Sequence, residues 1–454
     1  MQINKLDIEN FQLFANQSFA LHERFNLIVG VNGSGKTSLL RALAVALGGW
    51  AHAYIKDERN HRPILDEEIR EIHGDGRFDK TKFTKVTAIG KAAVIDRYHQ
   101  QKEGSVIWSR ARAEGTKHTR VDGSIQYGSN PTQYALNFET LGNDALMFID
   151  KGEKFALPLF AFYECDRIWK SAESIDPVEA SKTKYSRFDA YRDCFHTGAN
   201  HKQLGEWLLR NEMASAQKQV LTPVLLSIRA AAKVALEGCT GIRFDFDESR
   251  VLVEFNNGRV VPFEHLSDGQ RTMLGLFCDL ARRAAILNPH FGGEASLHTK
   301  GVVLIDELDL HLHPRWQRQI IRGLSSMFPN IQFICTTHSP FIIQALEVGK
   351  LVMLSGEGCG DINKMSIEDI AEEIQGIEIP QRSQRHQNMI KAAEEYFKAL
   401  REAQNVDAGT PHDEASLAAL KARLDILSAP FSNDPAYQAF LNVERLSVLG
   451  DRNL

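Results

Sequence analysis

Eight residues near the start of the chain have the side chains and the glycine spacing that bind phosphate groups. The segment Gly30-Val31-Asn32-Gly33-Ser34-Gly35-Lys36-Thr37 matches the pattern G-x-x-x-x-G-K-[S/T] in full. Glycines let successive backbone N–H groups face phosphate oxygens, while the lysine reaches the outer phosphates and the last hydroxyl binds Mg²⁺. We therefore predict an ATP and Mg²⁺ site formed by Asn32, Gly33, Ser34, Gly35, Lys36, Thr37 and Ser38.

Two adjacent acids end an apolar run later in the chain. Gly301–Ile305 has the composition of a buried strand, and Asp306 and Glu307 follow it directly. Paired carboxylates at the end of a buried strand are unfavourable without a cation nearby. We expect Asp306 to share the Mg²⁺ with Thr37, directly or through water, and Glu307 to orient or deprotonate the attacking water.

A second apolar run, which begins at Ile331, also ends in polar residues. Its last residues are Thr336, Thr337 and His338, followed by Ser339-Pro340. A histidine just past such a strand can hydrogen-bond the terminal phosphate of a nucleotide. We therefore predict that His338 senses whether that phosphate is present.

The pentapeptide Leu266-Ser267-Asp268-Gly269-Gln270 lies ahead of the acids and resembles the signature of ABC-type ATPases. The four motifs together resemble the ABC-type ATPases related to structural-maintenance-of-chromosomes (SMC) proteins, RecF, the break-repair head ATPases and the OLD nucleases. The opening Leu6–Phe11, followed by Phe14, is a further marker of this group. The resemblance implies that two heads sandwich two ATP molecules, with Ser267, Gly269 and Gln270 reaching the ATP held by a partner.

The elements that must position these residues follow from local patterns. Phe25–Val29 predicts a buried strand before the phosphate loop, and Ser38–Leu47 predicts a helix stopped by Gly48-Gly49. Short alternating runs such as Lys85–Ile89 and Ala93–Ile95 predict separate antiparallel strands. The fold class expected is α/β: an ABC-type P-loop ATPase head with a mixed sheet, helices and an antiparallel β part.

We predict four parts along the chain. Residues 1–165 form the N-terminal part of the head, and 166–240 a short helical insertion lobe. Residues 241–375 form the C-terminal part of the head with the signature, the acids and the switch histidine. Residues 376–454 form a helical docking tail, with helices expected at 389–404, 415–427 and 437–449.

Composition limits the class of protein. The formal net charge of -5 argues against a generally basic nucleic-acid-binding surface, although a local patch could still bind DNA. The six cysteines contain no C-x-x-C pair, which fits a reducing cytoplasm. We find no signal peptide and no apolar run of membrane-spanning length, so we expect no membrane partner.

Further stretches narrow the resemblance. Leu157–Arg167 with Ile168-Trp169, Ser186–Cys194 and Asp434–Leu441 resemble the PtuA ATPases of Septu antiphage systems and related retrons. Phe162-Tyr163-Glu164 stands where that family has Tyr-Tyr-Gly, so Tyr163 is either a nucleotide contact or a core residue. The resemblance implies a homo-oligomeric regulatory ATPase whose partner is a separate HNH nuclease, PtuB.

Two functions remain open at this point. No long heptad arm separates the phosphate loop from the signature, and no D-x-D of a Toprim nuclease follows His338. His311-Leu312-His313-Pro314 is better explained as a strand-to-helix turn than as a zinc site. The first function is a defence ATPase that controls an HNH nuclease, and the alternative is a RecF-like repair ATPase that clamps DNA when it binds ATP.

Overall fold

The computed structural model describes residues 1–55, 61–74, 77–95, 100–127, 132–165, 186–195, 200–354, 365–374, 384–404 and 414–429. Contacts divide the chain into two units, Met1–Gly376 and Ile377–Leu454, and each is described by itself. The predicted tail helix at 437–449, the segment Asp434–Leu441, Arg167 and Trp169 lie outside the described residues. The finer four-part division stays a prediction.

A five-stranded parallel sheet forms the centre of the first unit, with the strand order β10-β14-β15-β3-β16. Its strands are β3 (Phe25–Val29), β10 (Leu159–Tyr163), β14 (Gly301–Ile305), β15 (Ile331–Thr336) and β16 (Lys350–Met353). The register pairs Ile305 with Cys335 and Thr336 with Ile28. The carboxyl ends of β14, β15 and β3 therefore lie side by side, and the polar residues that follow them meet at one edge of the sheet.

A six-stranded antiparallel sheet forms a second layer, in the order β2-β1-β6-β7-β8-β9. Its strands are β1 (Gln2–Phe11), β2 (Phe14–Ala20), β6 (Phe83–Ile95), β7 (Gln101–Ala113), β8 (Arg120–Gln126) and β9 (Gln133–Ala135), and a separate hairpin joins β4 (Glu71–Gly74) to β5 (Arg77–Lys80). The prediction of two short strands in 85–95 was wrong, because β6 runs through Gly90 without a break. A Cβ on Gly90 would lie 2.0 Å from the Gln2 carbonyl oxygen, so this glycine permits close strand pairing rather than a turn.

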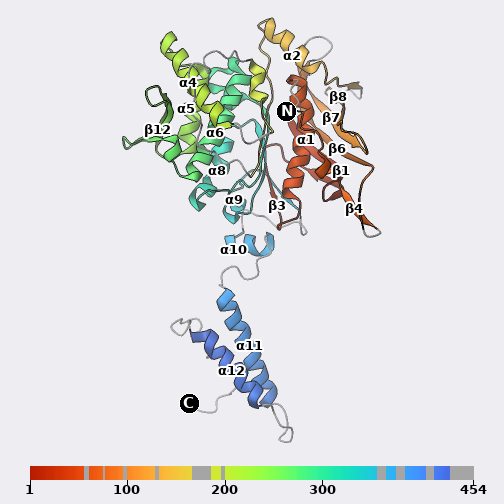
Figure 1. Ribbon diagram of the computed structural model, residues 1–454, viewed down its shortest axis with the longest axis vertical. Helices are drawn as coiled ribbons and strands as arrows, with labels where there is room; N and C mark the ends of the chain where they lie inside the picture. Colours follow the sequence, from red (N-terminus) through yellow and green to blue (C-terminus); the bar gives the residue numbers. More distant parts are fainter. Residues whose placement is uncertain are drawn as a thin grey trace. The chain divides into compact units, whose positions relative to one another are not determined.

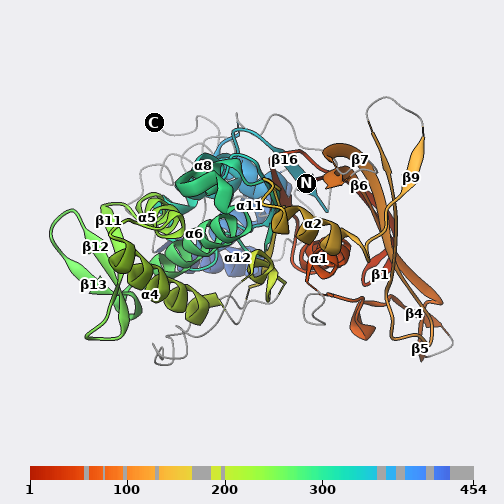
Figure 2. The ribbon, with the colours of Figure 1, turned by 90° about the horizontal axis from the view of Figure 1, so that it is seen from above.

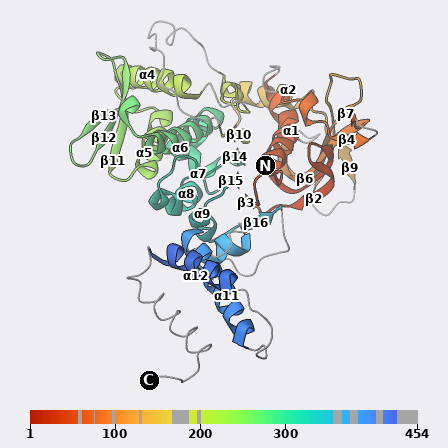
Figure 3. The ribbon, with the colours of Figure 1, turned by 60° about the horizontal axis from the view of Figure 1, so that its bottom comes forward.

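Helix α1 (Lys36–Tyr54) lies between the two sheets. Figure 2 shows α1 against the antiparallel sheet, and Figure 3 shows the parallel strands between α1 and the helices α5, α6 and α8. The prediction that Gly48-Gly49 stops the helix was wrong, because α1 continues to Tyr54. A Cβ on Gly48 would lie 2.6 Å from the His61 carbonyl oxygen, so the glycine is there for close packing against a neighbouring segment.

Helices cover the other face of the parallel sheet (Figures 1 and 3). Besides α1, the longer helices of the first unit are α2 (Leu141–Asp150), α4 (Asn200–Lys218), α5 (Pro223–Ala235), α6 (Asp268–Leu287) and α8 (Pro314–Met327). Of these, α2 contacts α1 and does not belong to the layer on the other face. Shorter ones are η2 (Asp66–Glu68), η3 (Arg187–Tyr191), η5 (Phe263–His265), η6 (Pro289–Glu294), α7 (Ala295–His298), α9 (Pro340–Gln344), α10 (Ile367–Asp369) and η8 (Ile370–Ile374). A three-stranded sheet of β11 (Cys239–Asp245), β12 (Arg250–Phe255) and β13 (Val260–Pro262) contacts α4 and α5, and β11 and β12 pair as an antiparallel hairpin.

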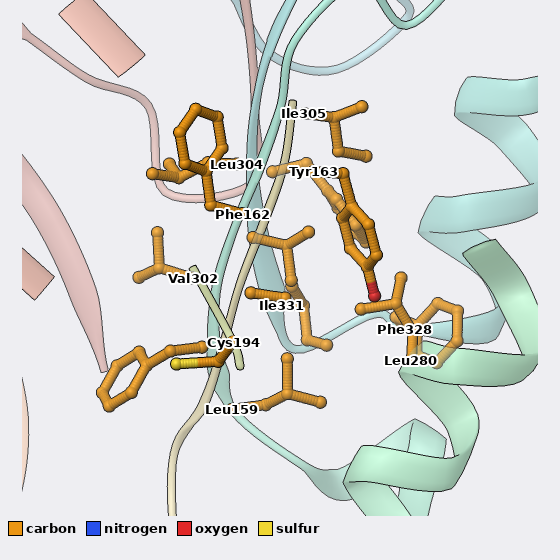
Figure 4. Packing of buried hydrophobic residues seen from close by; sticks show 14 of the residues in the cluster. Leu159, Phe162, Tyr163, Cys194, Leu280, Val302, Leu304, Ile305, Phe328 and Ile331 are labelled. Carbon is orange, nitrogen blue, oxygen red and sulfur yellow. The ribbon is translucent and has the colours of Figure 1, made fainter. Parts of the chain in front are cut away.

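Residues of β10 pack into both faces of the central sheet. In Figure 4, Phe162 points to one side of the sheet and Tyr163 to the other, where Leu280 of α6 and Phe328 lie. Tyr163 is 1% exposed. The structure therefore favours the core interpretation of Tyr163 over a nucleotide contact.

The Tyr163 hydroxyl contacts a buried cluster of charged side chains on α6. It donates a hydrogen bond of 2.7 Å to Asp279, which also accepts from Arg282 Nη2 at 2.6 Å and from Arg283 Nε at 2.8 Å. Asp279, Arg282 and Arg283 are all at most 2% exposed. Burial alone would raise the pKa of Asp279, but Arg283 and Arg282 bring it down to about 2.

The second unit contains two described helices, α11 (Gln384–Gln404) and α12 (Glu414–Ser428), which contact each other. Their small core consists of Ala392, Ala393, Phe397 and Leu424. The first two tail helices predicted from the sequence are thus present. Across the described ranges, no helix is long and apolar enough to cross a membrane.

The buried ion cluster on α6 yields a prediction about stability. We expect Asp279→Asn to lower the free energy of unfolding by about 3 kcal/mol, because two buried guanidinium groups lose their carboxylate. The folded pKa of Asp279 is depressed, so its contribution is complete above pH ~4 and is lost as the pH falls toward ~2. Urea unfolding of the wild type and the variant should therefore differ most near neutral pH and converge in acid.

Asp268→Asn is the matched control, because Asp268 lies on the same helix in an exposed pair with Arg271. It should change the unfolding free energy by less than about 1 kcal/mol. Equal effects of the two substitutions would contradict a special role for the buried cluster.

Candidate functional site

The phosphate loop joins β3 to α1 and has the backbone shape that a phosphate requires. Gly33 and Gly35 have φ of +81° and +99°, which only glycine adopts without strain. The position of a Cβ on Gly33 has no atom within 4 Å, whereas a Cβ on Gly35 would lie 2.9 Å from the Phe14 ring. The loop is therefore open at its tip, where Asn32 and Gly33 are exposed, and closely packed at its base.

Lys36 lies at the base of this loop and crosses back over it. Its Nζ donates to the carbonyl oxygens of Gly30 at 2.8 Å and Val31 at 3.1 Å. Burial lowers the pKa of Lys36, while Asp306, Glu307 and Asp309 act in the opposite direction. These three carboxylates therefore lie near enough to Lys36 to affect its pKa, as expected for residues at the same edge of the sheet.

Two hydroxyl groups hold the Asp306 carboxylate between adjacent strand ends. Thr37 Oγ1 donates to Asp306 Oδ2 at 2.9 Å, and Thr336 Oγ1 donates to Asp306 Oδ1 at 2.5 Å. Asp306 is 2% exposed, and its backbone N–H donates to the carbonyl oxygen of Tyr163 at 2.8 Å. The carboxylate therefore has a fixed position and orientation beside the first turn of α1.

Thr336 also positions the second acid. The Glu307 N–H donates to Thr336 Oγ1 at 2.7 Å, and Glu307 has φ of +49°, an unusual value for a residue other than glycine. The β14 chain therefore turns sharply after Asp306.

Asp309 links the acids to the predicted switch histidine. Its Oδ1 accepts hydrogen bonds from Thr337 Oγ1 at 2.5 Å and from the His338 N–H at 3.1 Å. His338 itself is exposed. The histidine is thus anchored through its backbone, and its side chain lies at the surface just after β15.

The residues present fit a nucleotide with its magnesium ion. Thr37 and Asp306 offer hydroxyl and carboxylate oxygens, the hard donors that Mg²⁺ prefers, and they already lie within hydrogen-bonding distance of each other. The Ser34 Oγ is buried and has no hydrogen-bond partner within the described residues, so a phosphate oxygen could accept from it. Backbone N–H groups of the first turn of α1, where the half-buried Ser38 lies, add favourable dipoles.

The signature residues form a helix start on a different part of the surface. Ser267 caps α6: the Gln270 N–H donates to Ser267 Oγ at 3.4 Å, and the Ser267 N–H donates to Gln270 Oε1 at 3.1 Å. Ser267 and Asp268 are exposed. A Cβ on Gly269 would lie 2.4 Å from the His311 carbonyl oxygen, so this position tolerates only glycine in the present packing.

A groove of about 940 Å³ runs along the signature. It is lined by Leu236, Glu237, Ser267, Asp268, Gly269, Gln270, His311, Leu312, His313, Arg315 and Trp316, and so by no residue of the phosphate loop. The helices that begin at the two motifs, α1 and α6, lie on opposite faces of the parallel sheet (Figure 3). The structure thus brings the phosphate loop and the acids together, and it places the signature apart from them.

The segment after the acids forms the predicted turn into a helix. His313 caps α8, accepting from the Arg315 N–H at 3.3 Å, and Pro314 is the first helical residue. His311 has φ of +62° and contributes its backbone to the signature groove. Within the described ranges, no three His, Cys, Asp or Glu side chains come together as a metal site.

Sequence reasoning missed Thr336 and Trp316 as site residues, and it missed the hydrogen bond between Asp309 and the His338 backbone. Thr336 touches both acids, Asp309 holds the backbone of His338, and Trp316 packs 3.0 Å from where a Cβ on Gly269 would lie. A polar residue at the end of β15 was visible in the sequence. Its partners depend on the order of strands in the sheet, which local patterns do not contain.

Comparison with known proteins agrees with the nucleotide site. Residues 5–223 match a family model described as an AAA domain, and residues 169–344 match one described as "AAA domain, putative AbiEii toxin, Type IV TA system". The retron Vc95 probable ATPase of Vibrio cholerae serotype O1 biovar El Tor is 24% identical over 403 residues, or 78% of this chain and 74% of that protein. The Septu protein PtuA of Bacillus thuringiensis is 24% identical over 420 residues, or 88% of this chain and 89% of that protein.

Among solved structures, the SMC head domain from Thermotoga maritima is 14% identical and covers 78% of this chain and 94% of its own, with a TM-score of 0.40. The retron relative is named a probable ATPase, and in this chain the phosphate loop lies beside the Asp306 carboxylate, as ATP hydrolysis requires. The chain is therefore an ATPase that is similar to the Septu protein PtuA and to a retron probable ATPase.

Proposed function

We propose that this protein is the ATP-dependent switch of an antiphage defence complex, in which two copies sandwich ATP and control a partner HNH nuclease. The observation that carries the ATP chemistry is the Asp306 carboxylate, fixed by the Thr37 and Thr336 hydroxyls beside the phosphate loop. The similarity to a Septu PtuA and a retron ATPase supports the defence role.

The residues of one chain have distinct roles in this scheme. The loop N–H groups and Lys36 bind the phosphates, and Lys36 gives up its contacts with the Gly30 and Val31 carbonyl oxygens to do so. Thr37 and Asp306 would hold Mg²⁺, which would supply positive charge beside the phosphate oxygens. Glu307 orients or deprotonates the attacking water, and His338 contacts the terminal phosphate.

The position of the signature supports assembly of the site from two copies. Ser267 and Asp268 are exposed beside an open groove, and that groove includes no phosphate-loop residue of the same chain. A symmetric dimer would bring the signature of each copy to the phosphate loop of the other. Ser267 and Gly269 would then complete the partner's site from the N-terminus of α6, whose dipole favours phosphate.

The nuclease partner is proposed from the family resemblance. Closure of two heads over ATP would change the surface offered to that partner, so nucleotide state would control its activity. Direct contact of the ATPase with DNA is the alternative, as in a RecF-like clamp.

Replacing Thr336 tests the catalytic arrangement. We expect Thr336→Val to lower ATP turnover by about 10- to 100-fold, because the Asp306 carboxylate and the Glu307 backbone N–H lose the hydroxyl that holds them. Thr336→Ser keeps the hydroxyl and should retain most activity. Steady-state phosphate release measures both variants; normal turnover in Thr336→Val would contradict the assigned role of this hydroxyl.

Mixing two inactive variants tests assembly in trans. Lys36→Ala removes the phosphate contact, and Ser267→Arg fills the space that the partner's phosphate needs. Each should be inactive alone, but a heterodimer has one intact loop facing one intact signature, so a 1:1 mixture should recover roughly a quarter of wild-type turnover. A mixture no more active than its parents would contradict the two-copy site.

Co-purification tests the partner. Glu307→Gln should bind ATP without hydrolysing it and so hold the closed dimer, which native mass measurement with and without ATP can detect. The HNH protein encoded by a neighbouring gene should purify with this chain. Stoichiometric DNA binding by the Glu307→Gln dimer, without any nuclease subunit, would instead favour the RecF-like clamp.

A further inference from the structure

A cavity of about 400 Å³ lies between α1 and the antiparallel sheet. Its walls are Gly49, His52 and Ala53 of α1, Arg110 of β7, Val121 of β8, and His61, Phe138 and Glu139. The α1 residues in the wall come 13 or more positions after Lys36, about 20 Å along the helix at 1.5 Å per residue. The cavity is therefore separate from the phosphate loop.

Arg110 is a fully buried cation in this wall. Its side chain is 0% exposed, and its Nη atoms donate to the carbonyl oxygens of Val45 at 3.3 Å and His61 at 3.2 Å. Its Nε is buried with no hydrogen-bond partner in the described part of the chain. A buried guanidinium whose partners are carbonyl groups and an imidazole nitrogen lacks the counter-charge that normally offsets its desolvation.

Neighbouring arginines on the same side of the sheet do have that counter-charge. Arg62 pairs with Glu68 at 2.5 Å, and Arg112 pairs with Asp66. Within the described ranges, no such ion pair is present for Arg110. Glu139 lines the cavity but is exposed, and no hydrogen bond or ion pair joins it to Arg110 there.

The two glycines in the middle of α1 make room for this cation. A Cβ on Gly48 would lie 3.2 Å from Arg110 Nη1, and a Cβ on Gly49 would lie 3.3 Å from Arg110 Cδ. Glycine in a helix interior is less favourable than alanine. Helix α1 therefore has two residues of low helix propensity where the Arg110 guanidinium packs against it.

The rest of the cavity adds hydrogen-bonding and positive groups. The rings of His52 and His61 meet edge to face at 4.8 Å, and His61 Nε2 lies 3.3 Å from Arg110 Nη2. Burial, and then Arg110, lower the pKa of His61 to about 4. Burial, and then Arg62, lower the pKa of Arg110 to about 9. Burial is the larger cause of both shifts.

We propose that this cavity binds a small phosphate-bearing molecule, whose phosphate oxygens pair with Arg110 and accept hydrogen bonds from the imidazoles of His52 and His61. Guanidinium groups bind phosphate through two parallel hydrogen bonds. A phosphate has more oxygens than a carboxylate, and the His52 and His61 rings offer donors for these further oxygens. The volume is within the range of small-molecule sites, and Val121 and Phe138 provide an apolar wall. The buried position of Arg110 favours a small molecule over a nucleic-acid strand.

Titration calorimetry on the full chain tests this site. Inorganic phosphate and ribose 5-phosphate are the probes, and the Lys36→Ala background weakens phosphate binding at the ATP site. We expect saturable binding of at least one probe, weakened about tenfold or more by Arg110→Gln. Arg120→Gln, an exposed arginine on β8, is the matched control and should leave binding unchanged. Glu139→Gln should leave it unchanged or strengthen it.

Gly49→Ala is a second test that keeps every charged group. Its Cβ would lie 3.1 Å from Val121 and 3.3 Å from Arg110 Cδ, so it should narrow the cavity and weaken probe binding. If Arg110→Gln does not fold, Gly49→Ala provides the test instead. The probe should raise the thermal unfolding midpoint of the Lys36→Ala protein but not that of the Lys36→Ala, Gly49→Ala double variant. No binding of either probe, or equal binding in Arg110→Gln and Arg120→Gln, would overturn the proposal. So would Arg110-dependent binding of a single-stranded oligonucleotide in place of the small probes.

Discussion

The burial of α1 between two sheets is the constraint on which the rest of the structure depends. One face of the helix packs on the parallel sheet and the other on the antiparallel sheet, and its residues from Ala42 to Ala51 are all buried. A helix in this setting cannot tilt or slide without disturbing both layers. The phosphate loop at its start therefore has a fixed position relative to the ends of β14 and β15.

The same constraint explains features that have no local cause. Gly48 and Gly49 lie inside the helix because the His61 backbone and the Arg110 side chain approach it there. Gly90 lies inside β6 because the backbone of β1 passes within 2.0 Å of where its Cβ would be. The Gln332 side chain of β15 exchanges two hydrogen bonds with the backbone of Ile3, at 2.8 and 2.7 Å, and so ties the two sheets together. Each feature reflects the close spacing of the layers.

The sequence predicts the parts of the site that depend on local chemistry. The phosphate loop, the strand before it and the acid pair after an apolar run could be located from residue types alone, as could the turn at His313-Pro314. The helix end at Gly48 and the strand break within 85–95 were wrong, because glycine was interpreted as a chain breaker where it permits close packing. The role of Thr336 depends on β15 lying between β14 and β3, and strand order is set by tertiary packing.

Tyr163 makes two hydrogen bonds, which connect the sheet edge at Asp306 to helix α6. Its carbonyl oxygen accepts from the Asp306 N–H at 2.8 Å, and its hydroxyl donates to Asp279 on α6 at 2.7 Å. The Asp279 carboxylate in turn binds Arg283, whose Nη1 donates to the carbonyl oxygen of Ala190. A shift of α6 would have to break this buried network or move β10 with it, and either change would reach the backbone of Asp306. The position of the signature and the geometry of the acids are therefore mechanically linked within one chain.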